Sequence, residues 1–196
     1  MDTFNELLNR ALEATGELLR HRGQRAAIVV VGGTALNLLG VVSRATGDVD
    51  VIAIATPQPD GLPSEIRAPD PLPGGLRDAV ATVARDLGLP PDWLNTTVAS
   101  QWQTGLPAGF ASRVTWNRHG GLWVGLAGRL DLIHLKLYAA ADDVGPSSRH
   151  YQDLVALKPT EQELKTAQNW IAMQDPSDAV ADAVRQVIGH VRAARR

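Results

Sequence analysis

The stretch that decides the fold is 29-VVVGGTALNLLGVVSRATGDVDVIAI-54, in which two apolar segments flank a glycine pair and a helix-like segment. The first apolar segment completes AAIVVV (26–31), which predicts a buried strand that Gly32 and Gly33 end. TALNLLGVVS then has the spacing of a short helix, with Thr34 placed to cap it. A second strand is predicted over residues 48–55. The stretch therefore predicts strand, glycine turn, helix and strand in that order.

The second strand begins with two like charges, Asp48 and Asp50. Side chains alternate faces along a strand, so both carboxylates should point the same way, about 6.6 Å apart along the chain. Val49 and Val51 should point into the core. Two neighbouring carboxylates repel one another unless a divalent cation lies between them, and oxygen ligands suit Mg²⁺ or Mn²⁺. The pattern therefore predicts that Asp48 and Asp50 bind metal.

The glycine turn supplies a second candidate feature. Gly32 and Gly33 let the backbone approach a phosphate at the mouth of the following helix, and Thr34 adds a hydroxyl. Arg44 precedes the strand that carries the aspartates. We expect Arg44 either to reach the phosphates of a nucleotide or to pair with Asp48.

Two further candidates lie in the second half of the chain. Lys136 interrupts the apolar segment DLIHLKLYAA, and RHYQD places Arg149 and Asp153 four residues apart, on one helix face. A lysine suits a triphosphate as a point charge, and an arginine binds phosphate with its fork. The alternative interpretation makes Lys136 a surface lysine and Arg149 with Asp153 an exposed helical pair.

The rest of the chain predicts a mixed α+β fold: a nucleotidyltransferase-type sheet with flanking helices, then an all-helical lobe. The expected domains are an α/β lobe at 1–128 and a helical lobe at 129–196, packed as one compact unit with a cleft. The supporting segments are a first helix to about residue 22, a surface loop at 57–75, a helix at 76–89, a β-hairpin around NRHGG (117–121), and helices from Leu130 onward.

Composition narrows the functional class. The 196 residues carry a net charge of −2 and no cysteine, which excludes disulfides, thiolate metal sites and a cysteine nucleophile. No apolar window approaches the roughly 18 residues needed to cross a bilayer, and the N-terminus does not resemble a signal peptide. We therefore expect a cytoplasmic protein without membrane contact. The five histidines form no zinc motif.

Aromatic and basic residues have two interpretations each. The tryptophans are predicted to pack in the core or the hairpin, although an exposed one could stack a nucleobase. Arginines near the two ends of the chain could form a basic rim for RNA or could be solvated charges at helix ends. The residues concerned are Trp93, Trp102, Trp116, Trp123 and Trp170, and Arg10, Arg20, Arg22, Arg25, Arg192, Arg195 and Arg196.

The order of these motifs resembles the polymerase β-like nucleotidyltransferase superfamily. More closely, GGTALNLLGVVSRATGDVDV, LIHLKLYAA and RHYQDLVAL are similar to AbiEii-type nucleotidyltransferase toxins, including the MenT toxins of toxin–antitoxin systems. The resemblance implies that Gly33 and Thr34 form the nucleotide-phosphate motif and that Asp48 and Asp50 bind metal. It also implies that Lys136 contacts the triphosphate and that Asp153 is the late acidic residue.

The resemblance also implies a substrate and partners. It implies transfer of a nucleoside monophosphate from an NTP to an RNA acceptor, the tRNA 3′ end, with inhibition of translation and growth and with a cognate antitoxin protein. Many superfamily members have a third carboxylate on a later strand, but the predicted hairpin segments contain no clear counterpart. Asp131 could substitute for it, but we expect Asp131 to lie in the first turn of its helix, where a negative charge is favourable. Two alternatives stay open: transfer to a protein side chain or to a small molecule such as an aminoglycoside, and a non-catalytic nucleotide-binding scaffold.

Overall fold

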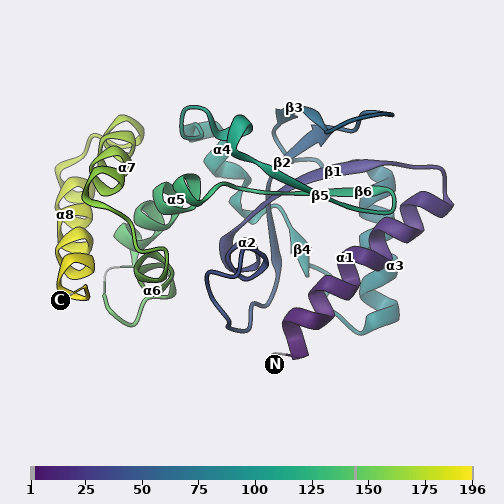
Figure 1. The fold of residues 1–196 in the computed structure, drawn as a ribbon, viewed down its shortest axis with the longest axis horizontal. Coiled ribbons are helices and arrows are strands. Elements are labelled where there is room, and N and C mark those ends of the chain that lie inside the picture. Colours follow the sequence, from purple (N-terminus) through teal and green to yellow (C-terminus); the bar gives the residue numbers. More distant parts are fainter. Residues whose placement is uncertain (1–2, 144, 196) are drawn as a thin grey trace. The chain divides into compact units, whose positions relative to one another are not determined.

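The computed structural model describes residues 3–143 and 145–195, which fold into two units. The first unit comprises residues up to 106 together with 111–127 and contains the sheet. The second comprises 107–110 together with residues from 128 onward and is helical. Figure 1 shows both sets of elements, and the predicted α+β class is confirmed.

Within the described chain, six strands form one mixed sheet, with β3-β2-β1-β6-β5 in order and β4 paired to β2 (Figure 1). β1 runs antiparallel to β2 and parallel to β6, and all six of its residues are buried. Its continuous apolar sequence therefore reflects a central position in the sheet. The strands are β1 (Ala26–Val31), β2 (Val49–Thr56), β3 (Ser64–Arg67), β4 (Leu94–Asn95), β5 (Thr115–His119) and β6 (Leu122–Leu126).

The connection between β1 and β2 follows the predicted order with shifted boundaries. β1 ends at Val31 as expected, and α2 (Gly32–Leu38) begins directly at the glycine pair. β2 begins at Val49, so Asp48 precedes the strand and only Asp50 lies within it. The expected start at residue 48 was therefore wrong by one position, because strand pairing with β4 begins at Val49.

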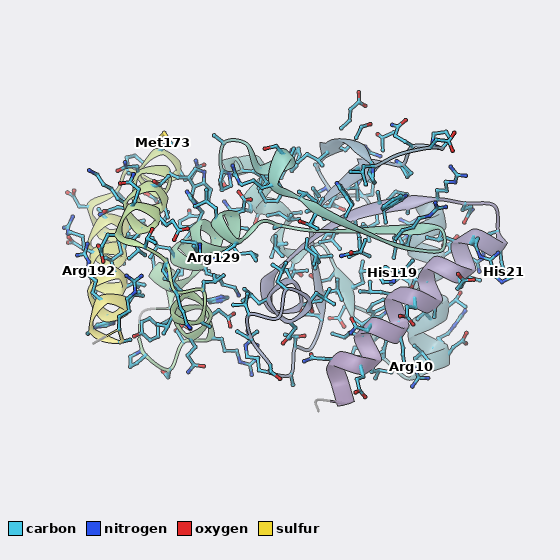
Figure 2. All side chains as sticks on the ribbon, in the orientation of Figure 1. Arg10, His21, His119, Arg129, Met173 and Arg192 are labelled. Atoms are coloured by element: carbon cyan, nitrogen blue, oxygen red, sulfur yellow. The ribbon has the colours of Figure 1, made fainter. Side chains whose placement is uncertain are left out.

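Helix α1 (Thr3–His21) packs on β5, β6 and the helix α3 (Gly74–Leu87). Gly16 makes this contact close, since a Cβ at that position would lie 1.8 Å from the carbonyl oxygen of His119. The amide of Gly121 also donates to the carbonyl of Gly16 at 2.8 Å. The hairpin end, marked by His119 in Figure 2, is thus held directly against α1.

The segment at 57–75 is not a loop throughout, contrary to the prediction. It contains β3, which pairs antiparallel with β2 through Ile54 with Arg67 and Thr56 with Ser64. A four-residue edge strand with mostly exposed side chains lacks the buried alternation that would predict it. The following helix α3 ends at Leu87, where Gly88 adopts the left-handed conformation of a helix cap.

The predicted β-hairpin is confirmed as β5 and β6, which pair antiparallel from Thr115 with Leu126 to His119 with Leu122. β5 begins at Thr115, and only Val114 separates it from a 3₁₀ turn formed by residues 110–113. The remaining short elements are η1 (Thr97–Ala99), α4 (Ser100–Thr104) and η2 (Phe110–Arg113).

The second unit contains the predicted series of helices: α5 (Arg129–Asp142), α6 (Arg149–Ala156), α7 (Glu161–Gln174) and α8 (Asp178–Ala193). α5 packs against the other three helices. No helix within residues 3–143 and 145–195 has the length and apolar character that a bilayer crossing requires.

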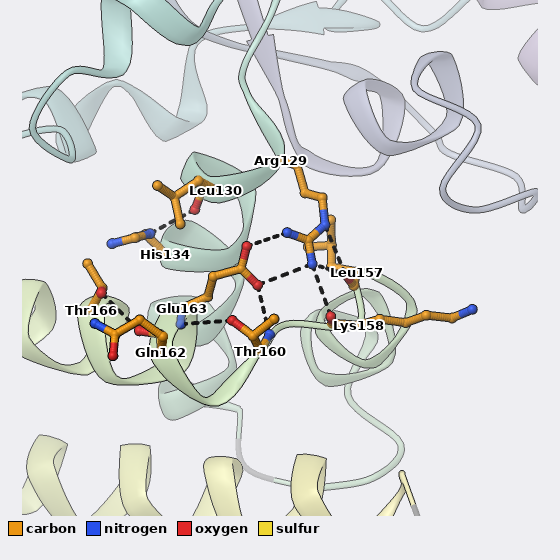
Figure 3. Close-up of polar contacts among 9 residues, drawn as sticks. All are labelled: Arg129, Leu130, His134, Leu157, Lys158, Thr160, Gln162, Glu163 and Thr166. Atoms are coloured by element: carbon orange, nitrogen blue, oxygen red, sulfur yellow. Dashed lines mark hydrogen bonds and ion pairs between the residues drawn. The ribbon is translucent and has the colours of Figure 1, made fainter.

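Arg129 joins the start of α5 to the α6–α7 connection (Figure 3). Its guanidinium donates to the carbonyls of Leu157 and Lys158 at 2.7 and 3.0 Å and to Glu163 at 2.5 Å. Glu163 also closes a capping box with Thr160, accepting from the Thr160 amide at 2.7 Å. Burial raises the pKa of the Glu163 carboxyl, but hydrogen bonds from Arg129 and Thr160 outweigh it and hold that pKa below 4.5.

Glu163→Gln is expected to lower the free energy of unfolding by about 1 kcal/mol at pH 7, since a neutral amide accepts less strongly from Arg129. A carboxyl with a depressed folded pKa contributes stability above its unfolded pKa and loses it as pH falls through the folded value. The difference from wild type should therefore shrink below about pH 4.5. Urea unfolding at pH 7 and pH 3.5 measures it, with Glu13→Gln, an exposed carboxylate on α1, as the control. A difference independent of pH would contradict the assignment.

Candidate active site

The glycine pair at the start of α2 is required by the side chains that surround it. Gly32 has a φ of +71°, and a Cβ there would lie 2.4 Å from Oδ2 of Asp50. A Cβ on Gly33 would lie 2.4 Å from the methyl carbon of Thr46. The lack of a side chain at both glycines therefore leaves room for Asp50 and Thr46 beside the turn, and Gly32 also provides its left-handed backbone.

The two aspartates occupy different settings. Asp50 is half-buried on β2 opposite Val31, the last residue of β1, which places its carboxylate beside the turn. Asp48 is exposed, and its Oδ2 accepts a hydrogen bond from Nδ2 of Asn95 at 3.2 Å. Asn95 lies on β4, next to Asp50 in the parallel register. Asn95 was not among the predicted residues, because a two-residue strand leaves no periodic signal in the sequence.

Thr34 does not cap α2, contrary to the prediction. The helix begins two residues earlier, its N-cap is Val31, and no side chain makes the capping bond. Instead the buried hydroxyl of Thr34 donates to the carbonyl oxygen of Asp48 at 2.5 Å and lies 3.2 Å from the hydroxyl of Thr46. This hydrogen bond links α2 to Asp48, the residue that precedes β2.

Arg44 is fixed through its backbone. The side-chain amides of Asn5 and Asn37 each donate to the Arg44 carbonyl oxygen at 2.9 Å. Its guanidinium nitrogens lie beside the glycine turn, 3.2 Å and 3.5 Å from the position of a Cβ on Gly33. Asn5 comes from α1, 39 residues away along the chain. No local pattern predicts such a bond, so sequence reasoning missed both asparagines.

A cavity of about 490 Å³ opens beside this network. Asn5, Asn37, Thr34 and Thr46 line it. It is also lined by apolar side chains of residues 38–42 and by the α1 residues Glu6, Leu8 and Asn9. The threonines that border Asp48 therefore form part of a cavity wall within the first unit.

The helical unit brings Lys136 and Asp153 together. The Lys136 ammonium lies 2.8 Å from Oδ2 of Asp153, and the two side chains are 8% and 1% exposed. Neither the interpretation of Lys136 as a surface lysine nor that of Asp153 as part of an exposed pair is therefore correct. Arg149, the first residue of α6, is exposed.

Asp131 lies in the first turn of α5, as predicted, and is fully buried. His134 lies one turn further along α5, with its Nδ1 2.7 Å from the Leu130 carbonyl oxygen (Figure 3) and its ring edge-to-face with Trp170. Across the part of the chain that the structure describes, no three His, Asp or Glu side chains are grouped so that they could hold a metal.

The structure gathers the predicted residues into two groups. Gly32, Gly33, Thr34, Arg44, Asp48 and Asp50 surround the glycine turn of the first unit, and Lys136 contacts Asp153 in the second. Comparison with known families supplies one match. A family described as "Nucleotidyltransferase of unknown function (DUF6036)" matches residues 7–144. No curated protein and no solved structure matches the chain.

Proposed function

Because this chain belongs to the DUF6036 family of nucleotidyltransferases, we propose that it transfers a nucleoside monophosphate from an NTP to an RNA acceptor, specifically a tRNA 3′ end. Inhibition of translation and growth would follow, and a cognate antitoxin protein would restrain the activity. The observation that best supports the proposal is the approach of Asp50 to the Gly32 turn. A carboxylate beside a backbone that can approach phosphate is the pairing that nucleotidyl transfer needs.

The donor set fits Mg²⁺ bound together with a nucleotide. Mg²⁺ in proteins is held by one or two carboxylates and substrate phosphates and keeps several waters. Asp48 is exposed and Asp50 half-buried, so both offer oxygen ligands without a closed protein cage. When bound, the ion would neutralise phosphate charge and favour departure of pyrophosphate. In this proposal Asp48 and Asp50 hold the ion, and Mn²⁺ can replace it.

The chemistry is an in-line displacement at the α-phosphate. A hydroxyl oxygen of the acceptor forms a bond to phosphorus, the bond from that phosphorus to the bridging oxygen breaks, and pyrophosphate leaves. The hydroxyl proton passes to solvent or to a carboxylate. Arg44 and Lys136 would offset the triphosphate charge, with Asp153 positioning Lys136, and Arg149 would add a phosphate-binding fork. Catalysis is then mainly positioning and electrostatics.

The acceptor is tested by incubating the pure protein with α-labelled NTPs, Mg²⁺, and total cellular RNA or total cellular protein. We expect label on RNA of tRNA size and release of pyrophosphate, both abolished by chelator and restored by added Mg²⁺. Label on protein or on a small molecule would show that RNA is not the acceptor. Nucleotide binding without pyrophosphate release would show a non-catalytic scaffold. Induced expression should stop growth for wild type and not for Asp50→Asn.

A further inference from the structure

The β5–β6 hairpin presents two tryptophans and an arginine on one face of the sheet. In the antiparallel register Trp116 is opposite Gly125, and Arg118 is opposite Trp123, so these four residues share a face. Leu122, Val124 and Leu126 point to the other face and are buried. Trp116 and Trp123 are half-buried and Arg118 is exposed. We call Trp116, Arg118, Trp123 and Gly125 the hairpin platform.

Arg118 is held in one orientation by its neighbours. Its Nε donates to the carbonyl of Gly120 at 3.1 Å, and its guanidinium carbon lies 5.6 Å from the centre of the Trp123 ring. Within the described chain, neither Nη group has a hydrogen-bond partner. An arginine fixed by a ring and a carbonyl, with its outer donors open, is suited to bind a phosphate.

The Trp116 ring lies over Gly125, the residue opposite it on β6, which has no side chain. A Cβ on Gly125 would lie 2.7 and 2.9 Å from two carbons of the Trp116 ring, so the ring covers the space that a side chain would fill. β5 is the edge strand of the sheet, and Trp116 remains half-buried there. An indole supported from beneath at a sheet edge is suited to stack a nucleobase.

The surrounding sequence has a charge that favours a polyanion. Residues 93–130 contain no Asp or Glu, while they include three arginines and four of the five tryptophans. The whole chain has a net charge of −2, so this segment differs from the rest in its electrostatics. Aromatic side chains on a chain segment of net positive charge are typical of single-strand binding.

We propose that the hairpin platform binds a single-stranded segment of RNA, with one unpaired base stacked on Trp116 and an adjacent phosphate bound by Arg118. Trp123 orients the Arg118 guanidinium. This inference rests on the proposed function, which requires an RNA acceptor, and adds the surface that selects an unpaired segment. The chemistry recognised is an unpaired base next to a backbone phosphate.

Binding is tested by fluorescence anisotropy with a labelled 12-nucleotide RNA, DNA of the same sequence, and the same RNA annealed to its complement. Trp116→Leu, which keeps an apolar contact with Gly125, should weaken binding of the single-stranded RNA about tenfold or more. Arg118→Gln should weaken binding and reduce the slope of log K against log salt by about 0.7, the effect of one lost phosphate contact. Single-stranded DNA should bind comparably to RNA, and the duplex weakly.

Two matched variants control for general effects. Trp102→Leu removes another half-buried tryptophan, on α4, and Arg77→Gln removes another exposed arginine, on α3. Both should bind RNA like wild type, and all four variants should keep wild-type far-UV circular dichroism. Two results with the variants would overturn the platform: a loss of RNA affinity in Trp102→Leu equal to that in Trp116→Leu, or unchanged RNA affinity in Trp116→Leu. Two results with the nucleic acids would do the same: single-stranded DNA bound more than tenfold more tightly than RNA, or the duplex bound as tightly as the single strand.

The platform and the proposed function can fail separately. If wild type labels RNA and Trp116→Leu binds and labels it equally well, the platform is wrong and the proposed function stands. If wild type binds RNA through the platform but transfers no nucleotide to it, the proposed function is wrong and the platform stands.

Discussion

Asp50→Asn is expected to lower nucleotidyl transfer by about 100- to 1000-fold, and Asp48→Asn by a similar factor. A divalent cation supplies several kcal/mol of charge stabilisation in the transition state, and each 1.36 kcal/mol is a factor of ten in rate. An amide keeps the shape of the side chain but loses the negative charge that holds the cation. Initial rates of pyrophosphate release, measured across a Mg²⁺ titration, give the size of the effect.

The same variants should remain folded. Asp48 is exposed, and the carboxylate of Asp50 lies against a glycine turn that an amide of equal size also fits. We expect their free energies of unfolding within about 1 kcal/mol of wild type. Asp86→Asn, an exposed carboxylate on α3, is the matched control and should keep full activity. Activity that survives in both Asp48→Asn and Asp50→Asn would remove these residues from the reaction.

Breaking the buried Lys136–Asp153 ion pair should produce the largest loss of stability. Removing one partner of a buried pair costs about 3–5 kcal/mol, because the other charge stays buried without its counterpart. The two side chains are 8% and 1% exposed, so solvent provides little screening. Lys136→Met and Asp153→Leu should therefore each lower the free energy of unfolding by this amount. Urea unfolding followed by circular dichroism measures the change.

A double variant separates structure from catalysis at this pair. Lys136→Met combined with Asp153→Leu replaces both charges with apolar groups of similar volume, which is often neutral for stability. We expect the double variant to regain most of the lost stability and to remain inactive, since no lysine is left to offset triphosphate charge. A stable double variant that transfers nucleotide at the wild-type rate would show that the pair serves only the fold.

Much of the sheet was predictable because its signals are local. The continuous apolar segment 26–31 gave β1, and the turn NRHGG gave the hairpin. β3 and β4 were missed because a short edge strand and a two-residue bridge carry almost no alternation. The parallel pairing of β1 with β6 joins residues nearly a hundred positions apart, and no pattern within either strand specifies that partner.

In the candidate site, too, the local features were predictable from the sequence and the long-range contacts were not. The glycine pair and the two aspartates were found because a strand, a turn and a charge pair are close together in sequence. The bond from Thr34 to the Asp48 carbonyl replaced the expected helix cap, since the backbone of the next strand offered an acceptor at 2.5 Å. The asparagines that fix Arg44 come from α1 and α2, so their role depends on how those helices pack.

By itself, the sequence determined the class of fold, the order of the main elements and the chemical types of the candidate residues. These features depend on apolar periodicity, glycine turns and charges, each of which is visible within a short stretch of sequence. Only the tertiary structure decided which side chains meet. It buried Lys136 against Asp153, placed Asn95 on Asp48, and set the Trp116 ring over Gly125. Such partners are chosen by packing between distant segments, where the free energy of a contact depends on neighbours that no short stretch of sequence contains.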